Sequence, residues 1–130
     1  MLFSENLNPL PLIVFANINL GFVDVTTLVT QGIEWQSTLK TSNFTAVSGE
    51  GYFCNTSGGA FTATLPSSAS IGDEISFIDY AGTFDTNNLT IGRNSHNIQG
   101  SAADLTVSTE RAGFTLVYVD STQGWLLKDK

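Results

Sequence analysis

The segment FTLVYV, residues 114–119, is the most informative part of the sequence about the fold. β-Branched and aromatic residues dominate it, and such residues favour strands. In a strand its first, third and fifth side chains would point to one face, while Val117 and Val119 would point to the other. A sheet face that is open to water carries polar residues. We therefore expect this strand to be covered twice, on one face by a second sheet and on the other by a neighbouring subunit or a loop.

Short strand-like segments also precede this stretch, and turn residues separate them. Residues 61–65 alternate apolar and polar side chains, and a proline and serines follow them. Glycine, asparagine and aspartate clusters bound the apolar segments 74–80, 89–91 and 105–107. Turn signals that recur about every eight to twelve residues are typical of sandwiches and barrels. The pattern predicts an all-β fold, with a single antiparallel β-sandwich or barrel-like domain over residues 34–130.

Residues 1–33 differ in character and predict an extended N-terminal arm. Pro9 and Pro11 favour extended backbone within a run of apolar residues that has neither helical nor alternating period. A short helical turn at residues 24–31, capped by Asp24, is compatible with the pattern. The apolar side chains of the arm need cover from the domain or a partner, so we expect the arm to anchor the protein. The residues expected to dock on the partner are Leu10, Leu12, Ile13, Val14, Phe15 and Phe22.

Composition excludes several classes of function. The 130-residue chain has a net charge of −7, and only 13% of its residues are charged. Its five basic residues form no cluster, so we expect it to bind neither nucleic acid nor anionic membrane surfaces. The apolar stretch 10–23 is broken by Pro11 and lacks a preceding basic region. A signal peptide or membrane span is therefore disfavoured, and we expect the protein to be made and assembled in the cytoplasm.

The residues that could perform chemistry are sparse, and we predict no catalytic, cofactor or metal site. His96 is the one histidine and lies in a turn cluster, where it has no second histidine or cysteine with which to share a metal. Cys54, the one cysteine, is expected to be a small buried hydrophobe. A pair of carboxylates that meets only in space stays open as an alternative. Most aspartates flank turns, where they are expected to bond backbone: Asp73, Asp79, Asp85, Asp104 and Asp120.

The large aromatic residues allow two interpretations. Stacked on a surface beside asparagine and aspartate, they would form a platform for sugars. Aromatic residues more often supply core or interface area, because they dominate burial energetics, and we favour that interpretation. The residues concerned are Trp35, Trp125, Tyr52, Tyr80 and Tyr118.

A series of short motifs runs through the body of the chain in a recognisable order. It begins with Ile33-Glu34-Trp35-Gln36, and it continues through Gly49-Glu50-Gly51-Tyr52-Phe53, Asn55-Thr56-Ser57-Gly58-Gly59-Ala60-Phe61 and Thr64-Leu65-Pro66, then Asn87-Asn88-Leu89-Thr90-Ile91, Leu116-Val117-Tyr118-Val119-Asp120 and Gly124-Trp125. In these motifs the chain from Ile33 to Leu127 resembles a surface module of tailed bacteriophages, especially those of cyanobacteria and marine bacteria. The module recurs in tail-fibre-like and other virion surface proteins. Ser95 departs from it by replacing the glycine expected after Asn94, which makes that turn costlier.

The resemblance implies a compact β-domain that assembles as a homotrimer on the virion and has no enzymatic role. A chain with one module and one arm suits a capsid decoration or head-fibre-like protein. Its expected partners are the major capsid protein or tail and baseplate proteins. A short tail fibre or baseplate component, or a receptor module that binds host glycans, remains the alternative. The residues expected at the subunit interface are Trp35, Val117, Val119 and Trp125.

Overall fold

The computed structural model describes residues 32–129. The predicted docking residues and helical turn of the N-terminal segment lie outside this range. Among the described residues the chain forms strands and no helix, so the predicted all-β class is confirmed. The strands are β1 (Glu34–Trp35), β2 (Phe44–Thr45), β3 (Glu50–Cys54), β4 (Phe61–Thr64), β5 (Glu74–Asp79), β6 (Leu89–Gly92), β7 (Leu105–Val107), β8 (Gly113–Asp120) and β9 (Gly124–Leu127).

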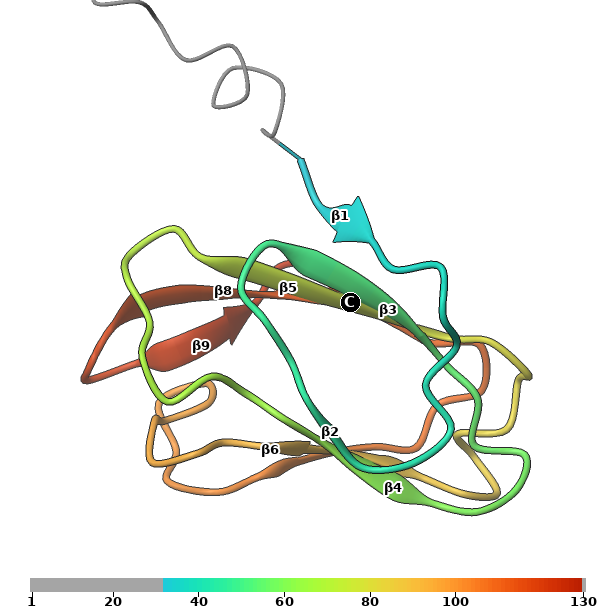
Figure 1. The fold of residues 1–130 in the computed structure, drawn as a ribbon. Helices are drawn as coiled ribbons and strands as arrows, with labels where there is room; N and C mark the ends of the chain where they lie inside the picture. The colour runs from blue at the N-terminus through green and yellow to red at the C-terminus, as the bar shows by residue number, and fades with distance from the viewer. Residues whose placement is uncertain (1–31, 130) are drawn as a thin grey trace, which may run out of the picture. The chain divides into compact units, whose positions relative to one another are not determined.

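The strands form two sheets that face one another across the core (Figure 1). Sheet A has the order β1-β3-β5-β8-β9, and sheet B has the order β2-β4-β6-β7. Two packed layers bury one face of each sheet, which is a stable arrangement for an all-β chain. The domain is therefore sandwich-like, and the alternative of a barrel is wrong because the two sheets remain separate.

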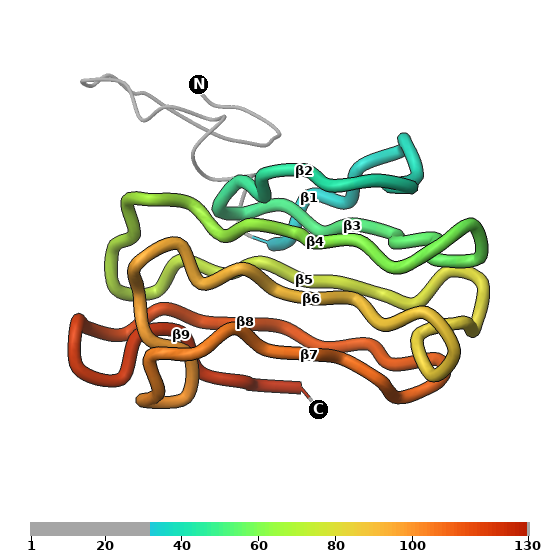
Figure 2. The backbone as a smooth tube through the Cα atoms, turned by 90° about the horizontal axis from the view of Figure 1, so that it is seen from below, coloured from blue at the N-terminus to red at the C-terminus, as the bar shows by residue number. Residues whose placement is uncertain are grey.

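The two sheets are mixed, so the prediction of antiparallel sheets is confirmed only in part. From β1 to β6 the chain alternates between the sheets, and each of the first four strands pairs in parallel with the strand two places further on. Only β7, β8 and β9 pair in antiparallel fashion with their neighbours. Each passage of the chain through one strand of each sheet makes one coil, and Figure 2 shows these coils stacked side by side. Parallel neighbours need a long crossover, and here the strand in the opposite sheet supplies it.

The coils differ in length, which explains why the sequence shows no internal repeat. Glu34 pairs with Glu50, whereas Gly51 pairs with the more distant Ser76. The connecting loops absorb the difference, and the strands themselves stay in register. The fold therefore consists of successive coils although the sequence has no repeat of fixed length.

The core lies between the sheets and takes alternate residues from the strands on both sides. Aromatic rings form much of its sheet A side: Tyr52 lies 5.9 Å from Phe77, and Tyr118 lies 5.4 Å from Trp125 between ring centroids. From sheet B, Phe44 packs against Tyr52 at 4.8 Å between ring centroids, and Phe61 joins aliphatic side chains in facing sheet A. The fully buried residues include Tyr52, Ile75, Phe77, Leu116 and Trp125 from sheet A and Ala63, Leu89 and Ile91 from sheet B.

The turn after β6 requires backbone that side chains disfavour. Asn94 and Ser95 both have positive φ, 50° and 72°, and the N–H of His96 donates to the Arg93 carbonyl at 3.1 Å. These are the features of a type I′ turn, for which Asn-Gly is the preferred pair. The expected strain at Ser95 is thus confirmed.

Candidate functional site

Asp79, at the end of β5, is the most elaborately bonded acidic side chain among the described residues. It is 2% exposed, and its carboxylate accepts hydrogen bonds from the backbone N–H groups of Gly82, Thr83, Phe84 and Arg111 at 2.9–3.1 Å. Burial acts to raise the pKa of this carboxyl, but the four N–H groups outweigh it and hold the pKa below the usual value. The carboxylate thereby ties the loop after β5 to the turn before β8.

Three other aspartates also accept backbone N–H groups. Asp73 accepts from Ser70 at 2.9 Å, and Asp104 accepts from Arg93 at 2.9 Å. Asp120 accepts from the two backbone N–H groups of the turn that follows it, at 2.8 and 3.0 Å. The prediction that the aspartates bond backbone is confirmed for Asp73, Asp79, Asp104 and Asp120, whereas Asp85 is exposed. Each bonded carboxylate braces a connection between strands.

His96 and Cys54 are held in structural positions as well. The Nε2 atom of His96 lies 3.0 Å from the carbonyl oxygen of Ser67, and its ring packs edge-on against Tyr118. Cys54 is fully buried, as predicted. Burial, followed by the nearby negative charge of Asp79, raises the pKa of its thiol to about 12, so the thiol stays protonated at neutral pH.

The same range holds no group of three His, Cys, Asp or Glu side chains suited to a metal ion. Within residues 32–129, no helix has the length and hydropathy needed to cross a membrane.

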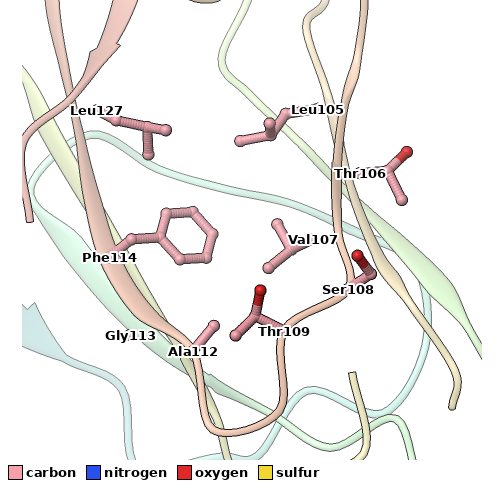
Figure 3. A pocket seen from close by; sticks show the side chains of 9 residues that line it. All are labelled: Leu105, Thr106, Val107, Ser108, Thr109, Ala112, Gly113, Phe114 and Leu127. Atoms are coloured by element: carbon pink, nitrogen blue, oxygen red, sulfur yellow. The ribbon is translucent and has the colours of Figure 1, made fainter. Parts of the chain in front are cut away.

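A groove of about 280 Å³ opens between β7 and the start of β8 (Figure 3). Leu105, Val107, Phe114 and Leu127 converge on it from the two sheets, and the hydroxyl groups of Ser108 and Thr109 lie at its rim. Its lining contains no ionisable side chain. The groove offers apolar contact and hydroxyl groups, but no acid, base or nucleophile activated by one.

The large aromatic residues are not gathered on one surface. Tyr52, Tyr118 and Trp125 belong to the core, while Trp35 and Tyr80 are 42% and 50% exposed. Trp125 is fully buried on the core side of β9, and its indole Nε1 has no hydrogen-bond partner. The prediction that Trp125 lies at the subunit interface is therefore wrong, because it presents no surface to a partner.

The outer face of sheet A, by contrast, is apolar. The residues of β8 that face away from the core include Val117 and Val119, which are only half-buried. Trp35 lies over Gly51 on the same side of the sheet and stacks on Phe53 at 5.1 Å between ring centroids. We call this surface the apolar face, and its members are Trp35, Phe53, Ile78, Val117, Val119 and Leu126.

The outer face of sheet B is polar. One row across the sheet consists of Thr62, Thr90 and Thr106, and the next row contains Thr45 and Thr64. We call this surface the threonine face.

Three of the four predicted interface residues, Trp35, Val117 and Val119, thus share one surface. Sequence reasoning missed Phe53, Ile78 and Leu126, which complete it. Their signal was the outward position in each strand, which could be read only with the strand pairing known.

No protein-family model matches the chain, and no curated protein matches it.

Proposed function

We propose that this protein is a non-enzymatic structural subunit of a tailed bacteriophage particle that works as a homotrimer. It would decorate the capsid, or form a head-fibre-like projection, and dock through its N-terminal segment. The observation that carries the proposal is the use of the acidic side chains. Asp79, Asp73, Asp104 and Asp120 brace the loops, which suits a rigid building block. The resemblance to the phage surface module supplies the setting.

Rigidity is what a particle component of this kind requires. Asp79 connects two loops that cross between the sheets, and Asn94 donates from its side chain to the Leu65 carbonyl at 2.8 Å. Such side-chain bonds to backbone order the loops. An enzyme, in contrast, keeps acidic and basic groups free to exchange protons with a substrate.

The experiment that tests this function follows the protein into particles. Full-length protein with Leu12→Asp and Phe15→Asp would be supplied during phage assembly, and purified particles would be probed for it. We expect the unchanged protein to co-purify with particles and the variant to be lost from them, while the variant stays folded. Lys130→Ala, outside the proposed docking segment, is the control and should be incorporated normally. Full incorporation of the double variant would show that this segment is not the anchor.

Copy number separates the two placements on the particle. A capsid decoration protein is present in many copies, whereas a short tail fibre or baseplate component is present in few. Quantitative mass spectrometry of purified particles, referenced to the major capsid protein, distinguishes them.

A glycan-binding receptor module is a second candidate, and the exposed ring of Tyr80 is the observation that favours it. Binding of host polysaccharide that is lost in Tyr80→Ala, with folding retained, would support this candidate.

A further inference from the structure

On the apolar face the Trp35 ring packs directly on the sheet, and the polar groups at the centre bond each other. A Cβ atom at Gly51 would approach the Trp35 ring to 2.5 Å and Ile33 to 2.7 Å, so the glycine allows the indole to lie flat on the sheet. Ser76 and Thr115, at the centre of the same face, bond each other at 2.7 Å. They are 3% and 8% exposed. The centre of the face therefore has no polar group that needs a partner.

The charges of the face cancel. Glu74 and Lys128 are its acid and base, and they pair with each other at 3.4 Å. The chain as a whole carries a net charge of −7, so two copies repel one another over most of their surface. The apolar face carries no net charge and its polar groups already have partners, so identical copies can meet there without that repulsion. A strongly basic partner would instead bind the acidic remainder of the surface.

The size of the patch is also suitable. The apolar side chains come from all five strands of the sheet, which at about 4.8 Å per spacing lie roughly 19 Å apart from first to last. Contiguous exposed apolar patches that reach across a surface mark interaction sites on soluble proteins. This face would form the apolar core of an interface, and the surrounding loops would form its rim.

We propose that copies of this chain associate through the apolar face of sheet A, so that in the trimer this surface packs against other copies of the chain around the three-fold axis. The inference rests on the proposed homotrimer and places its interface. Trp35, Val117 and Ile78 are the central contacts. The threonine face of sheet B then points outward, toward water.

The test compares one substitution on each outer face of the full-length protein. Val117→Lys puts a charge in the apolar face, and Thr90→Lys puts the same charge in the threonine face, at a mid-strand position that is also half-buried. Light scattering of the unchanged protein and of Thr90→Lys should give three times the subunit mass of 13.9 kDa. Val117→Lys should give a single subunit mass with an unchanged far-ultraviolet circular dichroism spectrum.

A milder variant keeps the test decisive if Val117→Lys fails to fold. Val117→Thr with Val119→Thr preserves shape and strand preference, and it should raise the concentration for half-dissociation at least tenfold. A trimer that persists unchanged in the double variant would overturn the placement of the interface and leave the virion function intact. A single subunit mass for the unchanged protein, together with its presence in particles, would overturn self-association in solution through any face.

Salt supplies an independent readout. Raised salt screens the repulsion between acidic copies and does not weaken apolar contact, so the trimer should persist or tighten. Dissociation at high salt would contradict an interface made of uncharged residues.

Discussion

The outer faces of the two sheets have the same strand backbone, but one is polar and the other is apolar. In sheet B the outward positions of β4, β6 and β7 carry Thr62, Thr90 and Thr106 in one row. In sheet A the outward positions of β5 and β8 carry Ile78, Val117 and Val119. Threonine favours strands as valine does, but it leaves a hydroxyl for water. Alternation therefore defines the core, while the outward residue decides whether water or protein covers the sheet.

The substitution with the largest expected effect removes the Asp79 carboxylate, which connects two of the loops that cross between the sheets. Asp79→Asn would set an amide group against four backbone N–H donors, in a site that is 2% exposed. Since losing a charged acceptor from a buried site leaves its donors unsatisfied, we expect a loss of about 3 kcal/mol of unfolding free energy. Urea unfolding measures it. Asp85→Asn, at an exposed aspartate, is the control and should change stability by less than about 0.5 kcal/mol.

The same carboxylate predicts acid sensitivity. Its pKa is held below the usual value in the folded state, so it contributes stability above the unfolded pKa, near 4, and that contribution is lost as pH falls through the folded pKa. The unchanged protein and Asp79→Asn should therefore differ most in stability at neutral pH and converge below about pH 4. A constant difference between pH 7 and pH 3 would show that the charge of Asp79 is not the source of the effect.

Two glycines sharpen the comparison, because each lies on one outer face. At Gly51 an added Cβ would meet the Trp35 ring at 2.5 Å, whereas at Gly92 it would meet Thr62 and Thr64 at 3.3 Å. Gly51→Ala should displace Trp35 and cost about 2 kcal/mol, since overpacked sites must shift. Gly92→Ala should cost less than about 1 kcal/mol, because small movements of threonine side chains suffice. Thermal unfolding gives the stability, and tryptophan emission reports the displacement, because Trp125 stays buried. Equal costs would indicate that Trp35 is not held flat on the sheet.

A pair of hydroxyl groups tests whether the apolar face is already closed to water. Ser76→Ala removes one partner of the 2.7 Å bond to Thr115, and it should cost about 1–2 kcal/mol because a buried hydroxyl is left alone. Adding Thr115→Val removes both hydroxyls and should restore most of that loss. On the threonine face, Thr90→Val should change stability by less than about 0.5 kcal/mol. A double-mutant cycle by urea unfolding measures the coupling, and additive costs for the two substitutions would mean that water reaches the pair.

The strands themselves could be predicted from the sequence, because period-2 alternation is present in segments such as residues 61–65 and 105–107. Their pairing could not. A turn signal after β3 or β5 marks where a strand ends, but the same signal serves a hairpin within one sheet and a crossover to the other. The antiparallel prediction failed for this reason. It succeeded for the pairs β6–β7, β5–β8 and β8–β9, and the last of these is joined by the short turn before Gly124.

The candidate surface was partly predictable for a related reason. Val117 and Val119 were recognised from a single strand, since both faces of β8 are apolar. Trp125 was misplaced because an aromatic residue in a short strand gives no sign of which face it occupies. Phe53 and Ile78 were missed because their place beside Val117 depends on pairings between segments distant in the sequence. Contacts between strands, unlike alternation within one, are set by the loops.

The smallest effect we predict leaves both faces alone and concerns the strained turn after β6. Ser95 has φ of 72° and is exposed, whereas Asn94, also at positive φ, donates to the Leu65 carbonyl at 2.8 Å. Ser95→Gly should stabilise the domain by about 0.5–1 kcal/mol, because glycine adopts this backbone without the steric cost. Asn94→Gly is the matched comparison: it relieves the same strain but loses a hydrogen bond, so the two effects should nearly cancel. Differential scanning calorimetry would show a higher melting temperature for Ser95→Gly alone. An equal rise in both variants would mean that the Asn94 side chain adds nothing to the turn.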